Sequence, residues 1–203
     1  MKNLLFTFLT ISFLISCSKK DDIPPQPQAD QLPEATTSGA NTAGCIINGK
    51  VLIPKNGSTS FTGTPYGLKY NYGGNFYPNK NDYWQLQISN NKDPNNNFGV
   101  VLWIKNMFVG NGDYLIGQSN GELYSLGPNN NQIFAGITEN GTSKTYWSSL
   151  NAGIIKITRS DLGVGISIYS GTFNCTLYNK DNPSEIIQIT EGRFDFNSLT
   201  LNK

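Results

Sequence analysis

Short apolar or alternating runs, each closed by a turn dipeptide, constrain the fold of this chain most strongly. Runs of this kind cover residues 83–88, 98–107 and 154–158. The first alternates, which places Trp84, Leu86 and Ile88 on one face, and the second is apolar on both faces, as in a central strand. Turn signals separate the runs, among them Asn56-Gly57, Gly73-Gly74, Asp93-Pro94, Asn111-Gly112, Asn120-Gly121, Asn140-Gly141 and Asn182-Pro183. The pattern predicts an all-β fold, a single antiparallel β-sandwich or bent barrel-like sheet.

Two changes of phase within the alternating pattern predict β-bulges. The apolar set lies on even positions at Ile166 and Ile168 and on odd positions after Gly171. A strand has a period of two, so one extra residue is required, and we expect it at Ser170-Gly171. A second change falls around Gly192, after which the polar side chains at 193 and 195 share one face and could pair. The alternative is a pair of separate strands with a tight turn at each glycine.

The first seventeen residues indicate export and lipidation. Lys2 is followed by an apolar stretch over residues 4–15, which has the length of a signal peptide and is too short for a membrane span. The stretch ends in Leu-Ile-Ser-Cys17, which resembles the lipobox of bacterial lipoproteins. We expect residues 1–16 to be a signal peptide and Cys17 to carry the lipid that attaches the protein to a membrane. The alternative is an ordinary secretory signal with an incidental cysteine.

The segment after the cysteine reads as a spacer. Residues 17–36 hold four prolines among polar residues and too little apolar surface to fold, so we expect a lipidated cysteine with a disordered tether, followed by a β-rich globular domain over 37–203. The sequence Lys19-Lys20-Asp21-Asp22 resembles the signal that sends Bacteroidota lipoproteins to the cell surface. It favours an outer-membrane location with surface exposure, although any polar tether would begin in a similar way.

Composition excludes several classes of function. The chain contains no histidine, which removes Ser-His-Asp and Cys-His catalysis and every His-containing metal site. Its formal net charge is +1 and it has no run of basic residues. The sequence therefore lacks the concentration of positive charge that is typical of nucleic-acid-binding proteins. We therefore assign no catalytic residue, no metal ligand and no cofactor.

Cys45 and Cys175 are the thiols that remain once Cys17 is lipidated. An exported protein folds in an oxidising compartment, so a disulfide between them is one expectation. The other is a pair of buried free cysteines that behave as small apolar side chains.

One region combines aromatic and amide side chains in a way that suits sugar binding. Aromatic rings can stack on sugar rings while amides bond the hydroxyls. The alternative is that the aromatic residues belong to the core and the asparagines to turns. The candidate ligand-binding residues are Tyr66, Tyr70, Tyr72, Tyr77, Tyr83 and Trp84.

Three stretches together resemble a family of uncharacterised Bacteroidota lipoproteins, known as a domain of unknown function. They are residues 35–50 (ATTSGANTAGCIINGK), 170–173 (SGTF) and 189–195 (ITEGRFD). The family commonly has an aromatic residue where this chain has Ala43. The resemblance implies a lipid-anchored envelope protein and supplies no activity or catalytic residue.

These observations lead to one principal hypothesis and three alternatives. The principal hypothesis is a membrane-anchored, non-enzymatic envelope lipoprotein that binds or scaffolds, with a glycan or an envelope protein as partner. The first alternative is a carbohydrate-binding module on the aromatic and Asn-rich region. The second is a glycan hydrolase, and the third is a carrier of apolar ligands in a closed barrel. The carboxylates open to a hydrolase are Asp113, Glu122, Glu139, Glu185 and Glu191.

Overall fold

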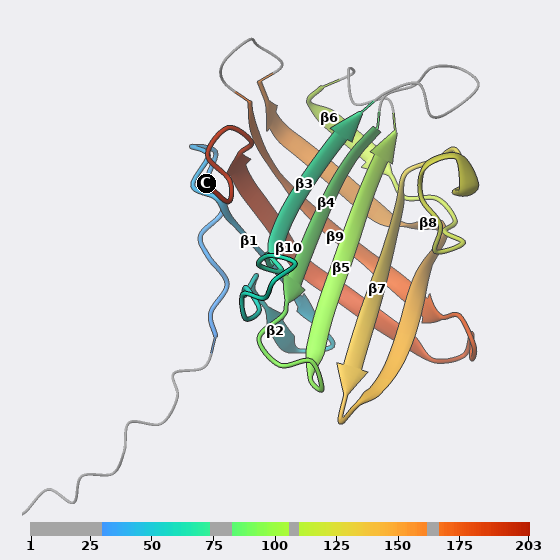
Figure 1. Ribbon diagram of the computed structural model, residues 1–203. Coiled ribbons are helices and arrows are strands. Elements are labelled where there is room, and N and C mark those ends of the chain that lie inside the picture. Colours follow the sequence, from blue (N-terminus) through green and yellow to red (C-terminus); the bar gives the residue numbers. More distant parts are fainter. Residues whose placement is uncertain (1–29, 74–82, 106–109, 162–166) are drawn as a thin grey trace, which may run out of the picture.

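The computed structural model describes residues 30–73, 83–105, 110–161 and 167–203 (Figure 1). The expected signal peptide, Cys17, most of the expected tether and Tyr77 lie outside these ranges. Within the described ranges, no helix is long and apolar enough to span a membrane. The described elements are β1 (Thr42–Ile47), β2 (Lys50–Leu52), β3 (Leu68–Gly73), β4 (Tyr83–Asn90), β5 (Asn97–Lys105), β6 (Gly112–Leu115), the 3₁₀ turn η2 (Tyr124–Leu126), β7 (Gln132–Glu139), β8 (Thr142–Ser160), β9 (Ile168–Asn179) and β10 (Ile186–Asn197).

The strands form one antiparallel sheet that curls into a half-barrel, which confirms the predicted all-β, barrel-like fold (Figure 1). Their order is β2-β1-β10-β9-β8-β7-β5-β4-β3, and β6 pairs with the second half of β8. Most neighbours in the sheet are also neighbours in sequence, as in hairpins. The pairs β5–β7 and β6–β8 each skip one strand, and β1, the first strand, pairs with β10, the last, and so joins the two ends of the domain.

Two of the hairpins at one end of the half-barrel have two-residue Asn-Gly turns. Asn48 and Gly49 connect β1 to β2, and Asn140 and Gly141 connect β7 to β8; all four have positive φ. A two-residue hairpin with both φ values positive matches the right-handed twist of its strands, and Asn and Gly adopt that conformation at the lowest cost. The strand order makes β1 and β7 run in the same direction, so both turns lie at the same end of the sheet.

The concave side of the sheet holds the core. Alternate side chains of the long strands point inward, and an aromatic cluster lies within this interior. Trp84 is fully buried there, with its ring 5.4 Å from Phe194 and 6.0 Å from Phe196. Tyr70, from the outermost strand β3, reaches across to Phe196 with ring centroids 5.0 Å apart. Contacts of this kind hold the two sides of the curled sheet together.

The structure confirms one predicted bulge and corrects the other. On β10 the register advances three residues, from Ile189 to Gly192, while β9 advances two, so Glu191 is inserted with a φ of 51°. At Ser170-Gly171, in contrast, β9 pairs with β10 without a shift. The extra residue there is Thr158 on β8.

The predicted position of that bulge was wrong because Ile168 is buried on the outer face of the sheet. Its side chain lies against Gly39, in the segment that precedes β1, while the neighbouring Tyr169 joins the interior cluster. The inward-facing side chains of β9 therefore belong to odd-numbered residues along the whole strand.

Candidate functional site

A cleft of about 620 Å³ opens at one end of the half-barrel, the lower end in Figure 1. It lies where the β1–β2 turn, the start of β5, the β7–β8 hairpin and the β9–β10 turn meet. Its lining residues are Ile47, Asn48, Lys50, Phe98, Ile137, Glu139, Asn140, Thr142, Lys144, Tyr146, Glu185, Ile186 and Ile187.

The floor of the cleft is apolar and belongs to the end of the core. Ile47, Ile137 and Ile187 are the last buried apolar residues of their strands at this end. Phe98 is partly buried against the same cluster, and Ile186 is about half exposed at the edge. The apolar surface that the floor leaves accessible therefore belongs mainly to Phe98 and Ile186.

One polar cluster in the wall is held rigidly by its own hydrogen bonds. Glu185 accepts bonds from Lys144 Nζ at 2.7 Å, Tyr146 Oη at 2.6 Å and Asn179 Nδ2 at 3.0 Å. The hydrogen bond from Lys144, and then that from Tyr146, lower the pKa of Glu185 to about 2. Burial, with the bond to Glu185 as a second cause, raises the pKa of Tyr146 to about 12. Near neutral pH the carboxylate therefore stays ionised and the phenol stays protonated.

A second ion pair spans the mouth of the cleft and is exposed. Lys50 Nζ, from β2, bonds Glu139 Oε1 at the end of β7, and it lies 5.5 Å from the centroid of the Phe98 ring. The two charged side chains are 64% and 51% exposed. A pair this exposed contributes about 0–1 kcal/mol to stability, so a ligand can rearrange it at little cost.

Several polar groups at this mouth have hydrogen-bonding capacity that the protein does not use. Within the described part of the chain, no protein group bonds Glu139 Oε2, Thr142 Oγ1 or the side-chain amide of Asn140. Both donors and acceptors are therefore available above an apolar floor.

The structure does not gather the predicted aromatic residues on one surface. Tyr70 and Trp84 face the interior, whereas Tyr83 stacks on Trp103 at 4.5 Å on the other side of the sheet. Tyr72 is 43% exposed on the edge strand, Tyr66 lies in the preceding loop, and Tyr77 is not among the described residues. Successive residues of a strand point to opposite faces, which divides the set. Trp84 is a core residue with no surface for a sugar.

Cys45 and Cys175 are both buried free thiols in the structure. They lie on β1 and β9, on opposite sides of β10, which separates their Cα atoms by about two strand spacings, roughly 9–10 Å. A disulfide requires Cα atoms within about 7 Å, so the two do not bond here. Burial raises the pKa of Cys45 to about 12 and also raises that of Cys175.

The carboxylates considered for a hydrolase are only partly brought together. Glu139 and Glu185 line the cleft, while Asp113 lies on β6, Glu122 precedes η2 and Glu191 pairs with Arg193 at the β10 bulge. Among the described residues, no group of three or more carboxylate or thiol side chains is placed to hold a metal ion.

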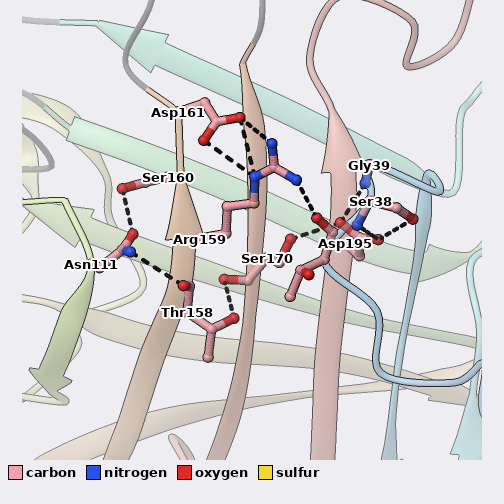
Figure 2. Close-up of polar contacts among 10 residues, drawn as sticks. Ser38, Gly39, Asn111, Thr158, Arg159, Ser160, Asp161, Ser170 and Asp195 are labelled. Atoms are coloured by element: carbon pink, nitrogen blue, oxygen red, sulfur yellow. Dashed lines mark hydrogen bonds and ion pairs between the residues drawn. The ribbon is translucent and has the colours of Figure 1, made fainter.

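Residues from each of the three stretches quoted above meet around Asp195 on the outer face of the sheet (Figure 2). This carboxylate accepts bonds from Thr36 Oγ1 at 2.6 Å, from Ser170 Oγ at 2.7 Å, and from the backbone N–H groups of Gly39 at 2.8 Å, Ser38 at 3.0 Å and Ala40 at 3.1 Å. The segment that precedes β1 is thereby fastened onto β9 and β10. Both carboxylate oxygens are occupied by protein groups, so this cluster is a structural clasp.

Sequence reasoning missed the cleft. Its lining residues come from positions 47 to 187, and each segment taken alone reads as an ordinary strand end or an Asn-Gly turn. Glu139 and Glu185 were named as candidate carboxylates and Asn140-Gly141 as a hairpin turn, but nothing in the sequence indicated that these residues share one cleft.

Comparisons of this chain with protein-family models, curated proteins and solved structures produced no match.

Proposed function

We propose that this chain is a lipid-anchored envelope protein whose folded domain binds a small ligand in the end cleft and does not transform it. The observation that carries the proposal is the cleft itself. Its volume of about 620 Å³ falls in the range of ligand pockets, roughly 300–1,000 Å³, and it combines an apolar floor with a few polar groups. The membrane anchor is supported by the signal-like residues 1–16 and the lipobox-like Cys17.

The lowered pKa of Glu185 in the cleft wall favours ligand binding over hydrolysis. A glycosidase needs a carboxylic acid whose pKa is raised so that it can donate a proton near neutral pH. Glu185 has the opposite shift, because Lys144 and Tyr146 stabilise its ionised form. Glu139, the other carboxylate of the cleft, is ion-paired with Lys50.

A fragment screen tests the proposal. Full-length protein in phosphatidylcholine nanodiscs is screened by ligand-observed NMR against a library of small polar and apolar compounds, with empty nanodiscs as the blank. We expect hits that compete for one site and are recovered chemically unchanged.

Two variants locate the site of those hits. Ile186→Asp places a charge on the exposed edge of the floor and should abolish binding, whereas Leu150→Asp changes a leucine that is 72% exposed outside the cleft and should leave binding intact. A screen without hits, or hits that bind the Ile186→Asp protein normally, would contradict the proposal.

A further inference from the structure

We propose that the ligand of the end cleft is a neutral saccharide, whose adjacent hydroxyls bond the Lys50–Glu139 pair while a sugar ring rests on the apolar floor. This inference rests on the proposed function and names the ligand class of the same site. It replaces the aromatic and Asn-rich region as the place where a sugar would bind.

The charges of the cleft favour a neutral ligand. Two cationic side chains, Lys50 and Lys144, and two anionic ones, Glu139 and Glu185, line it, and each cation is paired with one of the anions. A ligand with net charge would gain attraction from one member of each pair and repulsion from the other. A neutral ligand with polar groups meets no such penalty.

The depth of the cleft argues against a long acyl chain. The floor residues Ile47, Ile137 and Ile187 are themselves buried, and the interior beneath them is occupied by core side chains such as Leu177 and Ile189. An acyl chain would need a channel of its own length through that packed interior, where side chains interdigitate with few voids. A ring with an apolar face needs only the exposed surface of Phe98 and Ile186.

The unused polar groups match the chemistry of hydroxyls, which donate and accept. Glu139 Oε2 and Thr142 Oγ1 can accept, while the Asn140 amide and the remaining protons of Lys50 can donate. Neighbouring hydroxyls can bond the carboxylate and the ammonium at once, so the ion pair need not separate. Hydrogen bonds to charged groups are stronger than those between neutral groups, so this pair supplies most of the recognition.

The test measures binding of defined saccharides by isothermal titration calorimetry on full-length protein in nanodiscs. The probes are neutral oligosaccharides of glucose, mannose, galactose and N-acetylglucosamine, with oligogalacturonate and decanoate as charged comparisons. We expect at least one neutral oligosaccharide to bind and neither charged probe to do so.

Matched variants assign the binding to the ion pair. Glu139→Gln keeps the shape of the side chain and removes its charge, and it should weaken binding by about tenfold. Glu191→Gln alters another exposed, singly paired carboxylate at the β10 bulge, away from the cleft, and should bind as the wild type does. Both positions are exposed, and equal melting temperatures would show that the fold is retained.

The outcomes separate this inference from the proposed function. If fragments bind and lose that binding in Ile186→Asp, but no neutral saccharide binds, the proposal of a saccharide ligand is overturned and the small-ligand site is retained. A saccharide that binds the Glu139→Gln and wild-type proteins equally would overturn the role of the ion pair. Failure of both the fragment screen and the saccharide titrations would overturn both proposals.

Discussion

Asp195 has an environment that differs from the one its sequence context predicts. The alternation placed it on a polar face beside Arg193, where the two could pair. In the structure Asp195 is only 1% exposed. Arg193 does not pair with it and instead donates hydrogen bonds to the Glu191 carboxylate and to the carbonyl of Pro33. The difference arises because residues 36–40 cover the outer face at this point and supply backbone N–H groups to the carboxylate (Figure 2).

The ionised form of Asp195 should contribute stability that depends on pH. Burial raises the pKa of this carboxyl, but the hydrogen bonds from Thr36, Ser170, Ala40 and Gly39 outweigh burial and lower it to about 2. The folded value lies below the unfolded value of about 3.9, so the contribution is present above about pH 4 and is lost as pH falls toward 2. It amounts to about 2 kcal/mol.

Asp195→Asn tests this contribution. The variant should be less stable than the wild type at pH 7, and the difference in unfolding free energy should narrow by about 2 kcal/mol at pH 2.5. Urea unfolding at the two pH values measures it. Because Glu185 is present in both proteins, its own pH dependence cancels. An equal difference at both pH values would show that Asp195 is not ionised in the clasp.

At the scale of elements, the bulges of β8 shape the curl of the sheet. Between Ser148 and Gly153 the strand advances five residues while β9 advances two, and Asn151 has a φ of 58°. The strand then continues past the bulge to pair with β6. Bulges bend a strand and increase its twist, which is the curvature that a half-barrel requires. Gly153 is the residue at which pairing with β9 resumes, and it lies close against the β9 backbone.

Gly153→Ala should destabilise the domain by about 2 kcal/mol or more, because a Cβ at this position would lie 2.1 Å from the carbonyl oxygen of Asn174. Gly136→Ala in β7 is the matched control, since nothing lies within 4 Å of its added Cβ. The control should stay within about 0.5 kcal/mol of the wild type. Urea unfolding of both variants provides the comparison, and equal stability of the two would refute a tight contact at Gly153.

At the scale of the whole molecule, the described N-terminal segment is joined to the domain before β1 begins. Asp30 pairs with Lys55 at 2.6 Å, and the Pro33 carbonyl accepts a bond from Arg193 at 3.2 Å. These residues fall in the range expected for the tether, so the contacts of the folded part extend at least to residue 30. In Figure 1 this segment runs along the β1 side of the half-barrel.

The predicted cell-surface location can be tested on intact cells. Lys19 and Lys20 lie in the expected tether, so trypsin added outside should release a fragment that begins after one of them. Mass spectrometry of the supernatant identifies its first residue, and a periplasmic protein that stays intact shows that the envelope is closed. If the fragment is released only after the envelope is broken, the domain faces the periplasm.

Local sequence was enough to predict the all-β class, the hairpin turn at Asn140-Gly141 and the bulge near Gly192. These features depend on local period and local φ preferences, which a single segment contains. The absence of histidine likewise bounds the chemistry without any structure.

Which segments meet follows from strand pairing and packing across the whole domain. Ile168 shows why: an apolar residue on the outer face, buried by residues far away in sequence, gives the same signal as an inward-facing one. In the same way, Lys50 and Glu139 are 89 positions apart, and their meeting across the cleft depends on strand order and curl. The two-residue repeat of a β-strand assigns each side chain to one face of the sheet. It does not specify which side chains of other strands lie beside it, because those neighbours follow from long-range pairing and packing.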